Sequence, residues 1–161
     1  MYLGLGSNAG ESAAILDAAL VSLGSFISQP RASSLYRTSP RYILDQPDFL
    51  NLVLTGLVDI EPGELLDRTQ KIEASFGRDR SRERPKGERT LDIDILMYGS
   101  LVMDTERLKI PHPGMLERAF VLVPLLELDP ELVHPGTGIR FAEVLPSVRD
   151  QGIYLHDKAA L

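Results

Sequence analysis

The 161-residue sequence has no cysteine and no tryptophan, and only 6% of its residues are aromatic. The lack of cysteine excludes disulfide bonds, thiolate metal sites and a cysteine nucleophile. No apolar run approaches the roughly 20 residues that a transmembrane helix needs. No basic segment precedes an apolar stretch near the N-terminus, so we expect no signal peptide. These absences predict a cytoplasmic protein without a membrane partner.

The sequence also has no excess of positive charge. It contains 23 acidic and 17 basic residues, which give a net charge of −6. This balance opposes binding to a phosphate backbone, so we expect no nucleic-acid partner. The hydrophobic content of 43% and the charged content of 25% are typical of a folded globular protein. The length matches one domain. We therefore expect a single domain over residues 1–161 that is a monomer.

Hydrophobic periodicity predicts the element order β-α-β-β-α-β in the first two thirds of the chain. The predicted strands cover residues 1–5, 32–38, 50–59 and 91–98, and the predicted helices cover 11–24 and 62–77. This order is typical of the ferredoxin-like α+β fold, with two helices on one face of an antiparallel sheet.

The last third of the sequence supplies further elements. We expect a short strand near 101–103, a proline-rich turn at 111–113, a helix over 116–128, a short helix at 141–145 and a loose tail after Gly152. Pro124 should end or kink the first of these helices. A helical layer on the second face of the sheet would extend the ferredoxin-like core to an αβα three-layer sandwich.

The strongest local signal is the segment TLDIDIL at 90–96. Alternate residues of a strand share a face, so Asp92 and Asp94 should point the same way, roughly 6–7 Å apart. Two adjacent carboxylates repel each other, and a divalent cation such as Mg²⁺, bound together with substrate phosphates, resolves that conflict. The alternative is an exposed edge strand whose polar residues simply face solvent.

A basic segment precedes this strand, since residues 78–89 hold six of the 17 basic residues and three of the 23 acidic ones. The planar guanidinium group of arginine makes paired, charge-assisted hydrogen bonds to phosphate oxygens. A basic arm that leads into a carboxylate pair fits polyphosphate chemistry, although a solvated loop with local ion pairs would give the same composition. Upstream, Gln70 and Glu73 share one helix face, which is either exposed to solvent or contacts a nucleotide. Asn51 offers a hydrogen-bond donor and an acceptor to a heterocycle.

Several ordered motifs together resemble one known family. They are GSN at 6–8, YRTSP at 36–40, QPDFLN at 46–51, QKIE at 70–73, GR at 77–78, RTLDIDIL at 89–96 and IPHP at 110–113. In this order and over residues 4–135, they resemble the 6-hydroxymethyl-7,8-dihydropterin pyrophosphokinases of folate biosynthesis. That family transfers the pyrophosphoryl group of ATP to the pterin hydroxymethyl oxygen and releases AMP.

The resemblance implies roles for individual residues. Asp92 and Asp94 would hold two Mg²⁺ ions on the ATP phosphates, and Arg78 and Arg89 would close over those phosphates from mobile loops. The pterin would contact Phe49, Phe120, Asn51 and Asp92, and backbone groups around Thr38, Ser39 and Arg41. The remaining ATP contacts would come from Gln70, Glu73, Arg80, Ile95, Arg107, Lys109, His112 and Arg118.

Two positions depart from the family pattern. The segment RPKGER at 84–89 is one residue longer than expected and lacks the family's tryptophan, and Pro113 replaces an aromatic residue that often follows the histidine. Two other functions fit the residues alone. An Asp-x-Asp pair with arginines would also serve a two-metal phosphodiesterase or nuclease, and a non-catalytic ferredoxin-like module could carry the same pair on its surface.

Overall fold

The computed structural model describes residues 1–40, 45–78 and 87–157. Its main sheet has the strand order β5-β1-β4-β3-β8, with β2 also paired to β4, and each of these pairs is antiparallel. The strands are β1 (Tyr2–Ser7), β2 (Ser28–Ala32), β3 (Leu35–Thr38), β4 (Phe49–Leu57), β5 (Asp92–Met97) and β8 (Ile153–Asp157). Strands β5, β1, β4 and β3, with the two helices that connect them, confirm the predicted ferredoxin-like α+β core.

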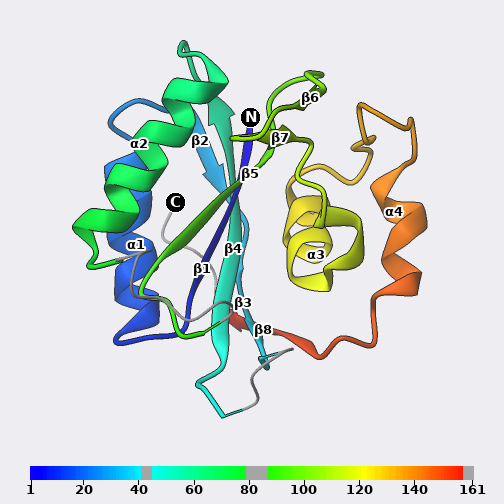
Figure 1. Ribbon diagram of the computed structural model, residues 1–161. Helices are drawn as coiled ribbons and strands as arrows, with labels where there is room; N and C mark the ends of the chain where they lie inside the picture. The colour runs from blue at the N-terminus through cyan, green and yellow to red at the C-terminus, as the bar shows by residue number, and fades with distance from the viewer. Residues whose placement is uncertain (41–44, 79–86, 158–161) are drawn as a thin grey trace.

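Helices cover both faces of the sheet, as Figure 1 shows. One face carries α1 (Ser12–Leu23) and α2 (Pro62–Ser75), and the other carries α3 (Ala119–Leu128) and α4 (Phe141–Val144). Two 3₁₀ turns, η1 (Met115–Glu117) and η2 (Leu145–Ser147), precede α3 and follow α4. The arrangement confirms the expected αβα sandwich.

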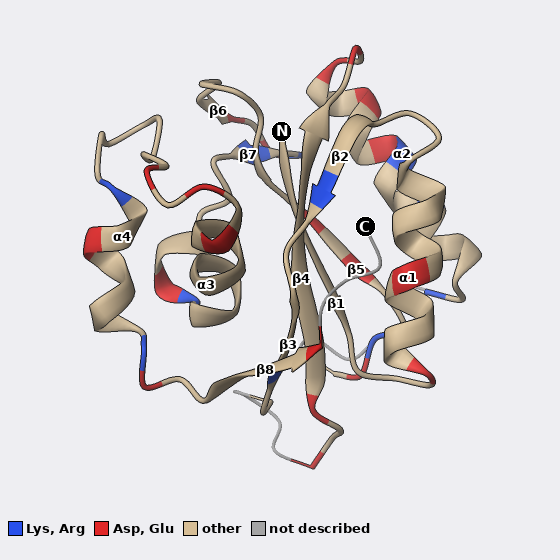
Figure 2. Ribbon diagram, turned by 180° about the vertical axis from the view of Figure 1, so that it is seen from behind, with Lys and Arg blue, Asp and Glu red and all other residues tan. Residues whose placement is uncertain are grey.

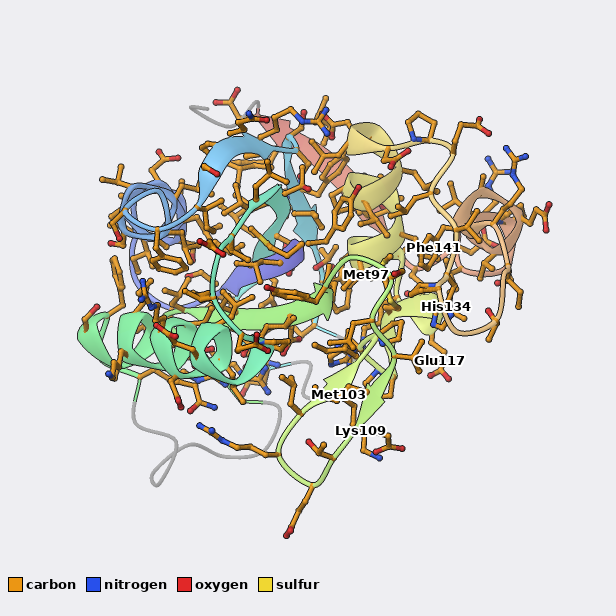
Figure 3. The ribbon with its side chains drawn as sticks, turned by 90° about the horizontal axis from the view of Figure 1, so that it is seen from above. Met97, Met103, Lys109, Glu117, His134 and Phe141 are labelled. Carbon is orange, nitrogen blue, oxygen red and sulfur yellow. The ribbon has the colours of Figure 1, made fainter. Side chains whose placement is uncertain are left out.

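A small hairpin of β6 (Met103–Asp104) and β7 (Lys109–Ile110) projects beside this sandwich, where Figure 3 labels Met103 and Lys109. The peptide bond between Ile110 and Pro111 is cis, within the proline-rich turn that the sequence predicts. No helix in the described part of the chain is long and apolar enough to cross a membrane.

Strand alternation divides the interior into two cores. Leu3, Leu5 and Ile93 pack toward α1 and α2, whereas Val53 and Leu96 pack toward α3 and α4. Each burial of a large aliphatic side chain contributes roughly 1.5–3 kcal/mol through removal of apolar surface from water. The second core leaves one end of its sheet face uncovered, and the candidate site lies there.

Two expectations for the last third need correction. Of the two effects expected of Pro124, an end of the helix is wrong, because α3 continues to Leu128, and a kink stays a prediction. Pro124 is buried against the second core, and its missing N–H removes only one bond from this short helix. The expected loose tail after Gly152 is wrong for Ile153–Asp157, which form β8 and pair with β3. Its partner lies more than 100 residues earlier, so no local pattern could reveal the pairing.

Candidate active site

A cavity of about 420 Å³ opens over the end of the sheet, between β4, β5 and the start of α3. It collects side chains from segments that are far apart in the sequence. Of the residues to which the family resemblance gives a role, those that line the cavity are Thr38, Ser39, Phe49, Asn51, Arg78, Arg89, Asp92, Asp94, His112, Arg118 and Phe120.

The floor of the cavity is flat because β1 carries glycine on this face. Gly6 lies between Asp92 of β5 and Asn51 of β4 in the sheet register, and Gly4 lies opposite Asp94. A Cβ atom added at Gly6 would approach Asn51 Oδ1 to 3.0 Å. The alternating glycines therefore leave room for a ligand between the acidic strand and the amide.

The acidic pair sits as the strand pattern predicts. Asp92 and Asp94 share the cavity face of β5, while Ile93 and Ile95 are buried on the opposite face. Figure 2 shows acidic residues on the ribbon of β5, which is an outer strand in the order of the main sheet. The side chains of Asp92 and Asp94 are 20% and 41% exposed, so Asp94 is the more open carboxylate.

Arginine side chains surround Asp92. One oxygen of Asp92 pairs with Arg78 and the other with Arg89. Arg78 also pairs with Glu73, a fully buried residue of α2 whose carboxylate accepts a hydrogen bond from the N–H of Ile93 at 2.8 Å. This chain of charges joins α2, the segment before β5 and β5 itself.

The two carboxylates have opposite electrostatic environments. Burial alone would raise the pKa of Asp92, but Arg89 and Arg78 outweigh burial and lower it. Burial and the adjacent charge of Asp92 raise the pKa of Asp94 to about 6. Among the described residues, Arg118 Nη1 and His112 Nε2 each lie 3.8 Å from Asp94 Oδ2. Asp94 is therefore the less closely paired of the two carboxylates.

This donor set fits hard divalent cations. Carboxylate oxygens are the ligands that Mg²⁺ prefers, and Mg²⁺ typically takes only one or two of them and completes its shell with water and substrate phosphates. Asp94 is open and poorly compensated, so a cation there would relieve the local repulsion.

Aromatic and amide groups line the rest of the cavity. The Asn51 amide donates to Thr38 Oγ1 at 2.9 Å, and both side chains are buried. Phe49 and Phe120 line the cavity from β4 and α3, and the Arg118 guanidinium lies 5.7 Å from the Phe120 ring centre. Burial and the charge of Arg118 lower the pKa of His112.

Asn8, from the predicted GSN motif, joins three segments next to the cavity. Its amide donates to Gln46 Oε1 and to the Pro47 carbonyl, each at 3.2 Å, and its Oδ1 accepts from the N–H of Arg89 at 2.7 Å. The N–H of Asn8 also donates to the carbonyl of Arg89 at 3.0 Å. Asn8 thus fixes Arg89 relative to the loop that leads to Phe49.

Other residues with an implied role lie away from the cavity. Ile95 is in the first core, Arg107 pairs with Asp67, and Lys109 pairs with Asp104 at 2.9 Å on the hairpin. Gln70 is partly buried on α2 but does not line the cavity, and Glu73 reaches it only through Arg78. Arg41 and Arg80 lie outside the described residues, as does the first half, 84–86, of the unusual segment at 84–89.

Sequence reasoning missed three features of the cavity. Gly4 and Gly6 form its floor, and the alternation of glycine with leucine at 3–6 was a usable signal for a strand with one bare face. Gln151 also lines the cavity, from a segment for which the sequence predicted no structure. A lone glutamine in a polar stretch carries no signal of this kind.

Comparison with known proteins finds one matching family and several similar proteins. The model of the family 7,8-dihydro-6-hydroxymethylpterin-pyrophosphokinase (HPPK) matches residues 2–130. A 2-amino-4-hydroxy-6-hydroxymethyldihydropteridine pyrophosphokinase of Methylorubrum extorquens is 43% identical, with 94% of this chain and 95% of the relative covered. The folic acid synthesis protein fol1 of Pneumocystis carinii is 40% identical over 95% of this chain.

The chain spans only about a fifth of the length of that fungal protein, at 20%, and of its Schizosaccharomyces pombe counterpart, at 21%. Among solved structures, wild-type HPPK-DHPS of Plasmodium falciparum superimposes with a TM-score of 0.70 over 91% of this chain and 44% of that one. The sequence identity there is 17%, so this likeness supports the fold alone.

Proposed function

The chain belongs to the 7,8-dihydro-6-hydroxymethylpterin-pyrophosphokinase family, and on that premise we propose that it transfers pyrophosphate from ATP to 6-hydroxymethyl-7,8-dihydropterin. The hydroxymethyl oxygen forms a bond to the β-phosphorus of ATP, and the bond from that phosphorus to the α–β bridging oxygen breaks. AMP leaves with the bridging oxygen, and the hydroxyl proton is released. The product is the pterin diphosphate, an intermediate of folate biosynthesis.

One observation carries the proposal for this chain: a single cavity is lined both by carboxylates with arginines and by an amide with aromatic rings. A polyphosphate needs the first set, because its charge must be neutralised and its phosphorus aligned. A flat heterocycle with ring nitrogens and an exocyclic amine needs the second. The hydroxymethyl group of the pterin would then lie between the two sets.

At the phosphate end, Asp92 and Asp94 would hold two Mg²⁺ ions that arrive with ATP. When bound, these ions neutralise charge on the β- and γ-phosphates and orient them for in-line attack. Arg78 and Arg89, already gathered at Asp92, would contact the phosphates as the site closes. His112 and Arg118 border Asp94 and would bind the same phosphate chain.

At the pterin end, Phe49 and Phe120 would stack on the ring and Asn51 would hydrogen-bond its edge. Thr38 would hold the Asn51 amide in place, since it accepts one of the amide protons. Ser39 would offer backbone groups at the rim. Roles for Gln70, Arg107 and Lys109 in ATP binding remain part of the proposal, and the last two would have to leave their present ion pairs.

The test is AMP formation from MgATP, measured with and without 6-hydroxymethyl-7,8-dihydropterin and repeated in EDTA. The proposal predicts AMP only when the pterin and the divalent metal are both present. AMP without pterin would indicate the phosphodiesterase alternative. Absence of AMP under every condition, with no binding of either substrate, would leave a binding module that shares only the fold.

A further inference from the structure

Gln151 connects the C-terminal segment to the candidate site. It lies between η2 and β8, beyond the residues 2–130 that match the family model, and it lines the cavity. Its Oε1 accepts a hydrogen bond from the N–H of Ala119 at 3.0 Å, and its Nε2 donates to the carbonyl of Glu117 at 2.9 Å. Figure 3 labels Glu117 beside α3.

These bonds supply what the helix start lacks. The first N–H groups of a helix have no partner within the helix, and Arg118, which precedes α3, provides no side-chain cap. Ala119 is almost fully buried, so an unsatisfied N–H there would be costly. Gln151 caps α3 from a distant segment and at the same time holds the end of η1.

The two anchored residues flank Arg118, and Phe120 follows directly. The Arg118 guanidinium lies 3.8 Å from Asp94 and 5.7 Å from the Phe120 ring centre. Hydrogen bonds to the carbonyl of Glu117 and the N–H of Ala119 fix the backbone on both sides of Arg118. They thereby set the direction in which Arg118 and Phe120 enter the cavity.

We propose that Gln151 is a positioning residue for the pterin: it holds the junction between η1 and α3 so that Phe120 is aligned to stack on the ring. This inference rests on the proposed function, because it takes Phe120 to contact the pterin. Preorganised aromatic groups bind more tightly than mobile ones, since less conformational freedom is lost on binding.

The main variant is Gln151→Met, which keeps the length of the side chain and removes both hydrogen bonds. The control is Ser147→Ala, which removes an exposed hydrogen bond to the Val144 carbonyl in the same C-terminal segment. Two quantities are measured for each protein: amide hydrogen exchange at Ala119 by NMR, and the dissociation constant of the pterin by calorimetry in the presence of a non-hydrolysable MgATP analogue.

We expect Gln151→Met to speed amide exchange at Ala119 and to weaken pterin binding about fivefold. A loss of this size corresponds to the net free energy of one hydrogen bond. Ser147→Ala should change neither quantity. Gln151→Glu, which can still accept from Ala119 but no longer donates to Glu117, should fall between wild type and Gln151→Met. In a Phe120→Ala background, Gln151→Met should cost little further affinity, because coupled residues are not additive.

Equal pterin affinity in wild type and Gln151→Met would overturn the inference alone, even if the thermal stability fell. So would a loss of the same size in the Phe120→Ala background, because Gln151 would then not act through Phe120. A wild-type protein that binds no pterin would overturn the proposed function and this inference with it. In that case the Ala119 exchange rates still show whether Gln151 caps α3, because this measurement does not depend on pterin binding.

Discussion

At the scale of single residues, the site places two carboxylates side by side, and their cationic partners lie at different distances. Asp92 is held by two arginines, while Asp94 is open to the cavity and lies 3.8 Å from Arg118. A protein gains no stability from such a pair, so the arrangement points to a ligand that compensates Asp94. Active sites commonly keep strain of this kind at the expense of stability.

Asp94→Asn should therefore stabilise the metal-free protein and inactivate it. In EDTA at pH 8 we expect a higher midpoint of thermal unfolding than for wild type, because the like-charge repulsion between Asp92 and Asp94 is removed. Turnover with MgATP should fall about a hundredfold or more, since metal ions contribute several kcal/mol to such reactions. Glu143→Gln removes an exposed carboxylate on α4 and is the charge-matched control. A less stable or fully active Asp94→Asn protein would contradict this account.

Tyr36 gives a pH-dependent prediction away from the metal site. Burial, together with the hydrogen bond from its hydroxyl to Glu127, raises the pKa of Tyr36 to about 12. The folded state therefore holds the phenol proton more tightly than the unfolded state does. The stability that this proton provides is complete below pH 10 and is lost as the pH rises through 12.

The difference in tyrosinate absorbance between wild type and Tyr36→Phe should accordingly show one phenol that titrates near pH 12. The Glu127→Gln variant should titrate at a lower pH, because the carboxylate no longer disfavours the phenolate. A Tyr36 phenol that titrates near pH 10 in the folded wild-type protein would show that the contact with Glu127 does not persist in solution.

At the scale of elements, alternation along strands accounts for most of what the sequence could predict. The segment LDIDIL shows which residues of β5 face the core, and the acidic face followed from spacing alone. The sequence predicts that Glu73 is either exposed or contacts a nucleotide. In the structure its carboxylate is fully buried, pairs with Arg78 and accepts a hydrogen bond from the N–H of Ile93. A helical spacing of three cannot distinguish a surface glutamate from one buried under an arginine, because the arginine comes from another element.

Asn8→Ala should loosen the connection between β1, the loop before β4 and the segment before β5. Three side-chain hydrogen bonds of a buried amide are lost, which should lower the free energy of unfolding by about 1–3 kcal/mol. Turnover should fall more than ATP affinity does, because Arg89 loses its anchor. The control is Ser22→Ala, which removes an exposed hydrogen bond within α1. A stable variant with wild-type turnover would show that Asn8 does not position Arg89.

At the scale of the whole molecule, the C-terminal segment completes the layer that bounds the site. The family model ends at residue 130, yet Phe141 of α4 is fully buried in the second core and β8 pairs with β3. Figure 1 shows α4 packed outside α3, on the face that carries the cavity. The sequence predicted the short helix at 141–145 but could not reveal β8 or the reach of Gln151, since both depend on partners far away in the chain.

Phe141→Ala tests whether this segment is integral to the fold. Removing a fully buried aromatic ring, which also contacts His134 at a centroid distance of 5.9 Å, should cost about 3–5 kcal/mol. Urea denaturation followed by circular dichroism measures the change. A loss below about 1 kcal/mol, typical of a surface substitution, would mean that α4 is dispensable for the second core.

The most direct test of the central claim follows the terminal phosphate of ATP. With ATP labelled at the γ-phosphate, Mg²⁺ and 6-hydroxymethyl-7,8-dihydropterin, the proposed reaction places the label on a pterin diphosphate and forms AMP in equal amount. Label on a pterin monophosphate with ADP as the coproduct, or label only in free pyrophosphate, would contradict transfer of the β- and γ-phosphates as one unit to the pterin.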